Sequence, residues 1–345
     1  MTTKPRLGFL GVGWIGRNRM EAMLATGAVE AAAIADPSPE MRLEAAKAAP
    51  DAAMVETLEE LLTQDLDGLV IASPSALHAE QSIRALEAGL AVFCQKPLGR
   101  TADETAAVVD AARTADKLLG VDLSYRHSNG MRAIRRAIAA GDLGTPFAAD
   151  LVFHNAYGPG KDWFFDPKQS GGGCVIDLGV HLVDLALWAM NWPEVVDVES
   201  HLMSGGSPLT EPASTCEDYA VATLRLANGA VVRLACSWKL PAGQMCEIAA
   251  DFYGTGGGAL FRNIAGSYTD FEAFRTAGTE RWHAAEPDSD WGGRAAADWA
   301  RRLASGQGFD PEAERLVDVA RVLDRIYQRP AEADRSTGVS EGLLA

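Results

Sequence analysis

Residues 6–16 read Arg6-Leu7-Gly8-Phe9-Leu10-Gly11-Val12-Gly13-Trp14-Ile15-Gly16, a short apolar run that leads into a glycine-rich turn. The apolar run predicts a buried strand, and the segment that begins at Trp14 has helical character. A Gly-x-Gly-x-x-Gly turn between a strand and a helix lets the backbone approach a pyrophosphate, which binds the free N–H groups of the helix. We therefore expect a dinucleotide-binding turn with the candidate cofactor-binding residues Gly11, Gly13, Trp14, Ile15 and Gly16.

An acidic residue lies at the position where a dinucleotide-binding turn is expected to have one. The apolar run 29–35 predicts a second strand, and it ends at Asp36, 20 residues after Gly16 (36 − 16). A carboxylate at this position binds the ribose hydroxyls of the adenosine and repels a 2′-phosphate. The sequence therefore favours NAD over NADP as the cofactor.

The alternation of strands and helices continues to about residue 123. Apolar runs at 52–55, 68–72, 91–94 and 119–123 alternate with helical segments. This order predicts a doubly wound parallel sheet of the Rossmann type in residues 1–123, an α/β domain whose ligands bind beyond the carboxyl ends of the strands. Further candidate cofactor-binding residues at those ends are Ser73, Pro74, His78, Gln95 and Lys96.

Lys96 is the candidate whose side chain could take a direct part in the reaction. Most lysines lie on solvated surfaces, but Lys96 follows a buried strand and precedes Pro97. A Lys-Pro bond at a strand end can be cis. An amine held at this edge could polarise a substrate hydroxyl.

A second glycine-rich segment leads into an apolar helix. Gly171-Gly172-Gly173 precedes a stretch that is apolar almost all round, apart from Asp177, His181 and Asp184. Their i, i+4, i+7 spacing places the three on one face, which must meet a satisfied polar core or a cleft. Two interpretations stay open: a structural Asp–His hydrogen bond, or an acid–base histidine that a carboxylate orients.

The rest of the chain predicts an α+β domain over residues 124–345. Asn228-Gly229 between two strand-like runs is a strong hairpin signal, and further strands are expected at 147–157 and 245–253. They predict an open, mainly antiparallel sheet that carries the apolar helix. Arg126 could bind substrate or cofactor, or form an ion pair between the domains. His154 ends a strand aimed at the same region and is a candidate substrate-binding residue.

Composition excludes several classes of partner. The net charge of −16 argues against nucleic acid and against anionic membranes. The five cysteines are odd in number and have no Cys-x-x-Cys spacing, which favours reduced thiols in the cytoplasm. We expect neither a signal peptide nor a stretch of transmembrane length.

Three motifs together resemble the Gfo/Idh/MocA family, which is named for glucose–fructose oxidoreductase and inositol dehydrogenase. They are the glycine turn 11–16, the segment Cys94-Gln95-Lys96-Pro97-Leu98, and the three glycines followed by Asp177-x-x-x-His181-x-x-Asp184. The resemblance covers most of the chain. Gln95 stands where the family usually has a glutamate.

The resemblance implies an NAD(P)-dependent dehydrogenase or reductase that acts on a CH–OH or ketone carbon of a sugar or cyclitol. The family's lysine, aspartate and histidine fall on Lys96, Asp177 and His181. His181 would take the hydroxyl proton, Asp177 would orient His181 or bind a substrate hydroxyl, and Lys96 would contact the reacting oxygen. Family members differ over whether the lysine or the histidine is the formal base. The resemblance also implies a homodimer or homotetramer formed through the C-terminal sheet.

Two other functions compete with this one. A non-enzymatic NAD-binding sensor of the same fold would not need to keep Lys96, Asp177 and His181. A metal-dependent hydrolase or isomerase could use His154, Asp177 and His181 as ligands. The metal alternative leaves the glycine turn unexplained, so no metal is expected.

Overall fold

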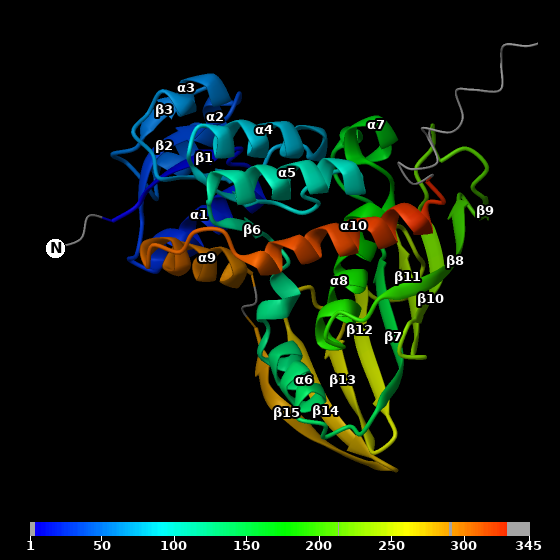
Figure 1. Cartoon of the computed structure of the whole chain (residues 1–345). Helices are drawn as coiled ribbons and strands as arrows, with labels where there is room; N and C mark the ends of the chain where they lie inside the picture. Colours follow the sequence, from blue (N-terminus) through cyan, green and yellow to red (C-terminus); the bar gives the residue numbers. More distant parts are fainter. Residues whose placement is uncertain (1–3, 213, 290–291, 330–345) are drawn as a thin grey trace, which may run out of the picture.

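The structure, a computed structural model, describes residues 4–212, 214–289 and 292–329. Figure 1 shows two units side by side, each built on its own β-sheet. The predicted domains 1–123 and 124–345 include residues 1–3, 213, 290–291 and 330–345, which lie outside the described residues.

The first unit is a six-stranded parallel sheet in the order β3-β2-β1-β4-β5-β6, which confirms the predicted doubly wound fold. Its central strands are buried on both faces because helices cover the sheet from both sides. The strands are β1 (Arg6–Leu10), β2 (Glu30–Ala35), β3 (Ala53–Val55), β4 (Gly68–Ile71), β5 (Ala91–Cys94) and β6 (Leu119–Val121). The helices between them are α1 (Trp14–Ala25), α2 (Pro39–Ala46), α3 (Leu58–Leu62), α4 (Ser75–Glu87) and α5 (Ala102–Ala115).

The second unit is a nine-stranded sheet in the order β15-β14-β13-β12-β7-β11-β10-β8-β9. Only β7 and β11 pair in parallel, so the predicted mainly antiparallel sheet is confirmed. The predicted hairpin joins β10 (Tyr219–Leu226) to β11 (Val231–Ser237). The other strands are β7 (Pro146–Asn155), β8 (Val195–Ser204), β9 (Ser207–Pro208), β12 (Cys246–Gly254), β13 (Gly257–Asn263), β14 (Phe271–Ala277) and β15 (Glu280–Asp288). Two short helices are α6 (Asn129–Ala139) and α7 (Pro167–Ser170).

The apolar helix lies in the core of this second unit. It begins with the π-helical turn Val175–Gly179 and continues as α8 (Val180–Ala189), in which every residue is buried. By length and composition the stretch Pro167–Ala189 could cross a membrane, contrary to the expectation that no stretch is long enough. It is nevertheless a core element, because 94% of its most apolar window is buried inside the protein.

Helix α9 (Arg294–Ala304) returns from the second unit to the first. Trp299 is 2% exposed and packs on Phe93 of β5, with ring centroids 5.8 Å apart. A Cβ atom at Gly68 or Gly120 would lie 3.0 Å or 2.6 Å from the Trp299 ring, so both glycines leave space for the indole. The division at residue 123 stays a prediction, and α9 adds a late segment to the first core.

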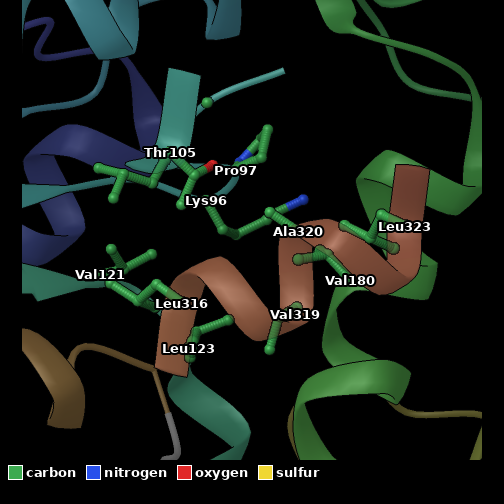
Figure 2. Close-up of a pocket in the computed structure, with 12 residues that line it drawn as sticks. Lys96, Pro97, Thr105, Val121, Leu123, Val180, Leu316, Val319, Ala320 and Leu323 are labelled. Atoms are coloured by element: carbon green, nitrogen blue, oxygen red, sulfur yellow. The ribbon is translucent and has the colours of Figure 1, made fainter. Parts of the chain in front are cut away.

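Helix α10 (Arg315–Ile326) connects both units. It contacts α5 of the first and α8 of the second, and it crosses the molecule between them in Figure 1. Figure 2 shows α10 covering the back of the Lys96–Pro97 segment, where a small cavity of about 30 Å³ remains. Apolar side chains line most of this cavity: Val121, Leu123, Val180, Leu316, Val319 and Leu323. Apolar side chains of α10 therefore face Lys96 across this cavity.

Candidate active site

The glycine turn after β1 has room only for glycine. Gly11 has φ +82°, and a Cβ atom there would lie 2.7 Å from the backbone of Ala72. A Cβ atom at Gly16 would lie 2.0 Å from the Gly11 carbonyl oxygen. Gly13 precedes α1, whose N-terminus has no side-chain cap and no acidic residue in its first turn. The turn therefore offers open backbone and free N–H groups, which fit a dinucleotide pyrophosphate.

Asp36 lies beside this turn at the end of β2. Its Oδ2 accepts a hydrogen bond from the Val12 N–H at 2.9 Å, and its Oδ1 accepts one from the Ser38 N–H at 2.9 Å. The two bonds fix the carboxylate at the edge of the glycine turn, where the adenosine ribose is expected. Arg42 donates to the Asp36 carbonyl oxygen and pairs with Glu56 at 2.9 Å, so its charge is already matched.

Lys96 and Asp177 join the two units. The Lys96 Nζ donates to the Asp177 Oδ1 at 2.6 Å and to the Asp177 carbonyl oxygen at 2.7 Å. The second carboxylate oxygen accepts a hydrogen bond from the Trp238 Nε1 at 3.0 Å. The Lys96–Pro97 peptide bond is cis. The lysine and the aspartate thus meet at the carboxyl end of β5, on the edge of the sheet that carries the glycine turn.

His181 lies one turn further along the helix and is 8% exposed. Its ring packs edge-on against Tyr125, with centroids 5.0 Å apart, and lies 6.3 Å from Phe153. Burial, together with the nearby Lys96 charge, holds the pKa of His181 well below its usual value. The imidazole is therefore neutral at neutral pH and can accept a proton.

The structure does not join the histidine to a carboxylate as the spacing predicted. Asp177 lies in a π-helical turn and bonds Lys96 and Trp238, and within the described residues no hydrogen bond connects it to His181. Asp184 is buried and pairs with Arg126, whose Nε donates to its Oδ2 at 2.8 Å. The predicted Asp–His hydrogen bond is therefore wrong. The two aspartates instead form separate ion pairs, Asp177 with Lys96 and Asp184 with Arg126.

Arg126 is a structural residue in this arrangement. Its guanidinium makes two hydrogen bonds to Asp184 and lies 5.0 Å from the centroid of the Trp192 ring. This bidentate pair uses two of the five N–H donors of the guanidinium and fixes its plane on the Asp184 carboxylate. Arg126 thus forms an ion pair within the second unit, not the expected pair between the domains, and its binding of substrate or cofactor stays a prediction.

His154 points away from the site. Successive side chains of a strand alternate between the two faces of the sheet. Phe153 of β7 faces His181, so His154 faces the opposite side. There its Nδ1 lies 2.8 Å from the Ser237 Oγ, and its ring stacks on Tyr219. The expected role of His154 in substrate binding is therefore not supported.

His78 ties two loops of the first unit together. It is buried, and its ring nitrogens lie 2.7 Å from the Pro97 carbonyl oxygen and 2.8 Å from the Ser73 carbonyl oxygen. Ser73 also donates its hydroxyl to Gln81, and Pro74 precedes the first turn of α4. Because burial lowers the pKa of His78, its neutral ring donates to only one of these two carbonyl oxygens, but both ring nitrogens face the loops after β4 and β5.

Gln95 belongs to a buried polar cluster that sequence spacing did not reveal. Its Nε2 donates to the Asp122 Oδ2 at 2.8 Å, and the same oxygen accepts a hydrogen bond from the Arg19 Nε at 2.6 Å. Arg19 and Asp122 are 103 positions apart, so no local pattern joins them. In this cluster Asp122 supplies the carboxylate, and Gln95 is an uncharged side chain that donates a hydrogen bond to it.

The three glycines before the helix are held by Glu217 and Tyr327. The Glu217 carboxylate is 1% exposed and accepts hydrogen bonds from the Gly173 N–H at 3.0 Å and the Val175 N–H at 2.8 Å. The Tyr327 hydroxyl donates to Glu217 at 2.7 Å, and a Cβ atom at Gly172 would lie 2.1 Å from that hydroxyl oxygen. This clamp fixes the start of the helix that carries Asp177 and His181. Sequence reasoning missed it because Glu217 lies in a segment that reads as an exposed loop.

Within residues 4–212, 214–289 and 292–329, no group of three or more His, Cys, Asp or Glu side chains is placed to hold a metal ion. The two histidines that the metal alternative would use also separate, because His154 lies on the far face of the sheet from His181.

Two family models match the chain. Residues 6–123 match the model described as an oxidoreductase family with an NAD-binding Rossmann fold, and residues 131–260 match the GFO/IDH/MocA C-terminal domain. The two matches confirm the resemblance that the motifs indicated.

Several curated relatives are about 30% identical to this chain. The 1,5-anhydro-D-fructose reductase of Ensifer adhaerens is 31% identical over 214 residues, which cover 61% of each chain. The D-glucoside 3-dehydrogenase of Escherichia coli (strain K12) is 30% identical over 221 residues, which cover 61% of this chain and 62% of the relative. The chain thus matches about three-fifths of the length of these two relatives. A putative UDP-kanosamine synthase oxidoreductase subunit of Amycolatopsis mediterranei is 30% identical over 251 residues, which cover 68% of each chain.

Solved structures share the fold over nearly the whole chain. A levoglucosan dehydrogenase in complex with NADH and levoglucosan superposes with a TM-score of 0.80, at 22% identity over 94% of this chain and 97% of the other. An aldose-aldose oxidoreductase from Caulobacter crescentus has the same TM-score at 19% identity, over 94% and 97% of the two chains. At this identity the likeness concerns the fold alone.

Proposed function

Because the chain belongs to the Gfo/Idh/MocA family of oxidoreductases, we propose that it transfers a hydride between a nicotinamide cofactor and a CH–OH or ketone carbon of a sugar, sugar derivative or cyclitol. The observation that supports this most directly is the meeting of Lys96 with Asp177, next to a neutral His181, beside the glycine turn. The two residues of the ion pair come from different units, which is how a cleft between a cofactor domain and a substrate domain is built.

The cofactor we propose is NAD. Its pyrophosphate would lie on the turn Gly11–Gly16 and its adenosine ribose beside Asp36, whose carboxylate disfavours a 2′-phosphate. Arg42 donates to the Asp36 carbonyl oxygen and forms a salt bridge with the exposed Glu56 at 2.9 Å. When bound, the nicotinamide supplies the hydride acceptor for oxidation or the hydride donor for reduction.

His181 is the general base in this proposal. It is neutral, so a ring nitrogen has the lone pair needed to take the proton of the substrate hydroxyl as the carbon is oxidised, although the burial and the Lys96 charge that lower its pKa weaken it as a base. Lys96 has its ammonium protons directed at Asp177, and an ammonium has no lone pair with which to accept a proton. Lys96 therefore donates a hydrogen bond to the reacting oxygen and stabilises the negative charge that develops there. Asp177 holds Lys96 in place, and Trp238 in turn holds Asp177.

We further propose a cytoplasmic homodimer or homotetramer that associates through the nine-stranded sheet. On the face of this sheet that α8 does not cover, Val231 is exposed and Val152 and Val221 are half-buried. Light scattering of the eluting protein tests this, and a monomeric mass at micromolar concentration would contradict it.

The central experiment follows the absorbance of the reduced nicotinamide. The protein is incubated with NAD, and separately with NADP, against inositols, hexoses, anhydro sugars, glucosides and sugar acids, and in reverse with keto sugars. We expect turnover with NAD and at least one of these compounds, and its loss in Lys96→Ala. The matched control is Lys47→Ala, which removes a surface lysine paired with Glu44 at 2.7 Å and should leave turnover unchanged. Tight NAD binding without turnover on any compound would instead favour the sensor.

A further inference from the structure

A loop of the second unit reaches over the glycine turn of the first. It leaves the end of β7 and leads to the short 3₁₀ helix Asp162–Phe165, with Lys161 as the residue before it. A Cβ atom built on Gly13 would lie 3.9 Å from the Lys161 Nζ. The ammonium of an exposed lysine in the substrate unit therefore lies directly over the turn that we assign to the cofactor phosphates.

The charges around this ammonium are unbalanced. The start of α1 carries the positive end of the helix dipole, and it has neither a side-chain cap nor an acidic residue in its first turn. Within the described residues, no carboxylate forms a salt bridge with Lys161. Two positive groups thus face each other over an open turn, which is unfavourable unless an anion lies between them.

We propose that Lys161 binds the pyrophosphate of the dinucleotide from the side of the second unit. The inference rests on the proposed function and adds a residue to it. Lysine suits this position because it is a compact charge on a flexible stem and can follow a phosphate oxygen. The dinucleotide is then held on one side by the backbone of the glycine turn and on the other by the substrate unit.

The loop that presents Lys161 is anchored on the same side chain that holds Asp177. Phe165 packs edge-on against Trp238, with centroids 5.6 Å apart, and Trp238 donates its Nε1 hydrogen to the Asp177 carboxylate at 3.0 Å. The phosphate contact and the Lys96–Asp177 pair therefore share one aromatic support. A cofactor bound by Lys161 would therefore link the loop that packs on Trp238 to the glycine turn of the first unit.

Calorimetric titration tests the inference without any turnover. NAD and ADP-ribose, which carries the pyrophosphate but lacks the nicotinamide, are titrated into the wild type, Lys161→Ala and Lys161→Arg. Lys168→Ala is the matched control, because Lys168 is an exposed lysine of the neighbouring helix α7. We expect Lys161→Ala to bind both ligands about 5- to 50-fold more weakly, in the range of a phosphate contact. Lys161→Arg should retain most of the affinity, and the loss should shrink at high salt because the contact is exposed.

The outcomes separate this inference from the proposed function. NAD binding by the wild type with equal affinity in Lys161→Ala would overturn the role of Lys161 and leave the oxidoreductase proposal intact. A loss for NAD but none for ADP-ribose would also overturn it, because the contact would then lie at the nicotinamide half. An equal loss in Lys168→Ala would mean that loop charge in general, not this contact, attracts the dinucleotide. Failure of the wild type to bind either ligand would overturn both proposals.

Discussion

Replacing Gln95 with glutamate should destabilise the protein in a way that depends on pH. The Gln95 amide is buried and donates its hydrogen to the Asp122 Oδ2 at 2.8 Å. Asp122 is also buried, and Arg19 is its ion-pair partner at 2.6 Å. A glutamate at position 95 would place a second carboxylate against the first with only one arginine to balance the two.

The size of the effect follows from two limits. Two charges 2.8 Å apart repel by about 6 kcal/mol at an effective dielectric constant of about 20. The new side chain can avoid this by keeping its proton, which at pH 7 costs about 3.7 kcal/mol for a group with an unperturbed pKa near 4.3. The side chain follows the route with the smaller free-energy penalty. We therefore expect the free energy of unfolding to fall by about 3–4 kcal/mol at pH 7, less the attraction that Arg19 provides.

The sign of the pH dependence follows from linkage. The introduced carboxyl has a pKa raised in the folded state above its unfolded value, so the penalty grows as the pH rises above about 4.3 and vanishes below it. With an unfolding entropy of about 2.1 cal/mol/K per residue, the melting temperature should fall by about 5 °C at pH 7 and by only about 1–2 °C at pH 5.

Thermal unfolding at pH 5 and pH 7 measures this difference. Gln95→Met is the control, because it removes the same hydrogen bond without adding a charge. It should lower the melting temperature by a similar amount at both pH values. Adding Asp122→Asn to Gln95→Glu restores one carboxylate and one amide, and it should recover most of the loss. A melting temperature that drops equally at both pH values would refute the reasoning, as would a double variant no more stable than the single one.

Other substitutions test the site itself. Replacing His181 with alanine should reduce turnover by roughly 10²–10⁴-fold if it is the base; turnover near that of the wild type would assign the proton transfer elsewhere. Because burial and Lys96 hold the pKa of His181 well below 6.5, the wild-type pH–rate profile should show no titration near 6.5, and a limb there that disappears with the histidine would contradict this. Asp36→Ala should weaken NAD binding far more than NADP binding, and calorimetry that finds the preference unchanged would reject its place at the ribose. Glu217→Gln should lower turnover and leave NAD affinity unchanged, because the clamp holds the helix of Asp177 and does not touch the glycine turn; equal losses in both would mean a general loss of folding.

Local sequence signals predicted most of the fold. The turn Gly11–Gly16, the strand–helix alternation and the hairpin at Asn228-Gly229 each depend on residues a few positions apart, and the structure places them as expected. Their physical requirements, positive φ angles and apolar faces, are local, so the sequence carries them directly.

The side-chain contacts of the site could be predicted only in part. That Asp177 and His181 share a helix was visible, but the π-helical turn that directs Asp177 to Lys96 has no simple sequence signal. The pairing of Arg126 with Asp184 spans 58 positions, and the clamp of Glu217 with Tyr327 spans 110. The direction of His154 depended on the strand register, which fixes the face of every side chain at once.

The return of α9 to the first unit limits how this protein can be divided or recombined. A fragment that ends at residue 123 would leave the hollow between Gly68 and Gly120 without the indole of Trp299, and so would expose apolar surface to water. An exchange of substrate units between two relatives at that single junction would pair one protein's sheet with the other's α9. Chimaeras should therefore keep α9 with its own sheet and join the parents at two points of the chain.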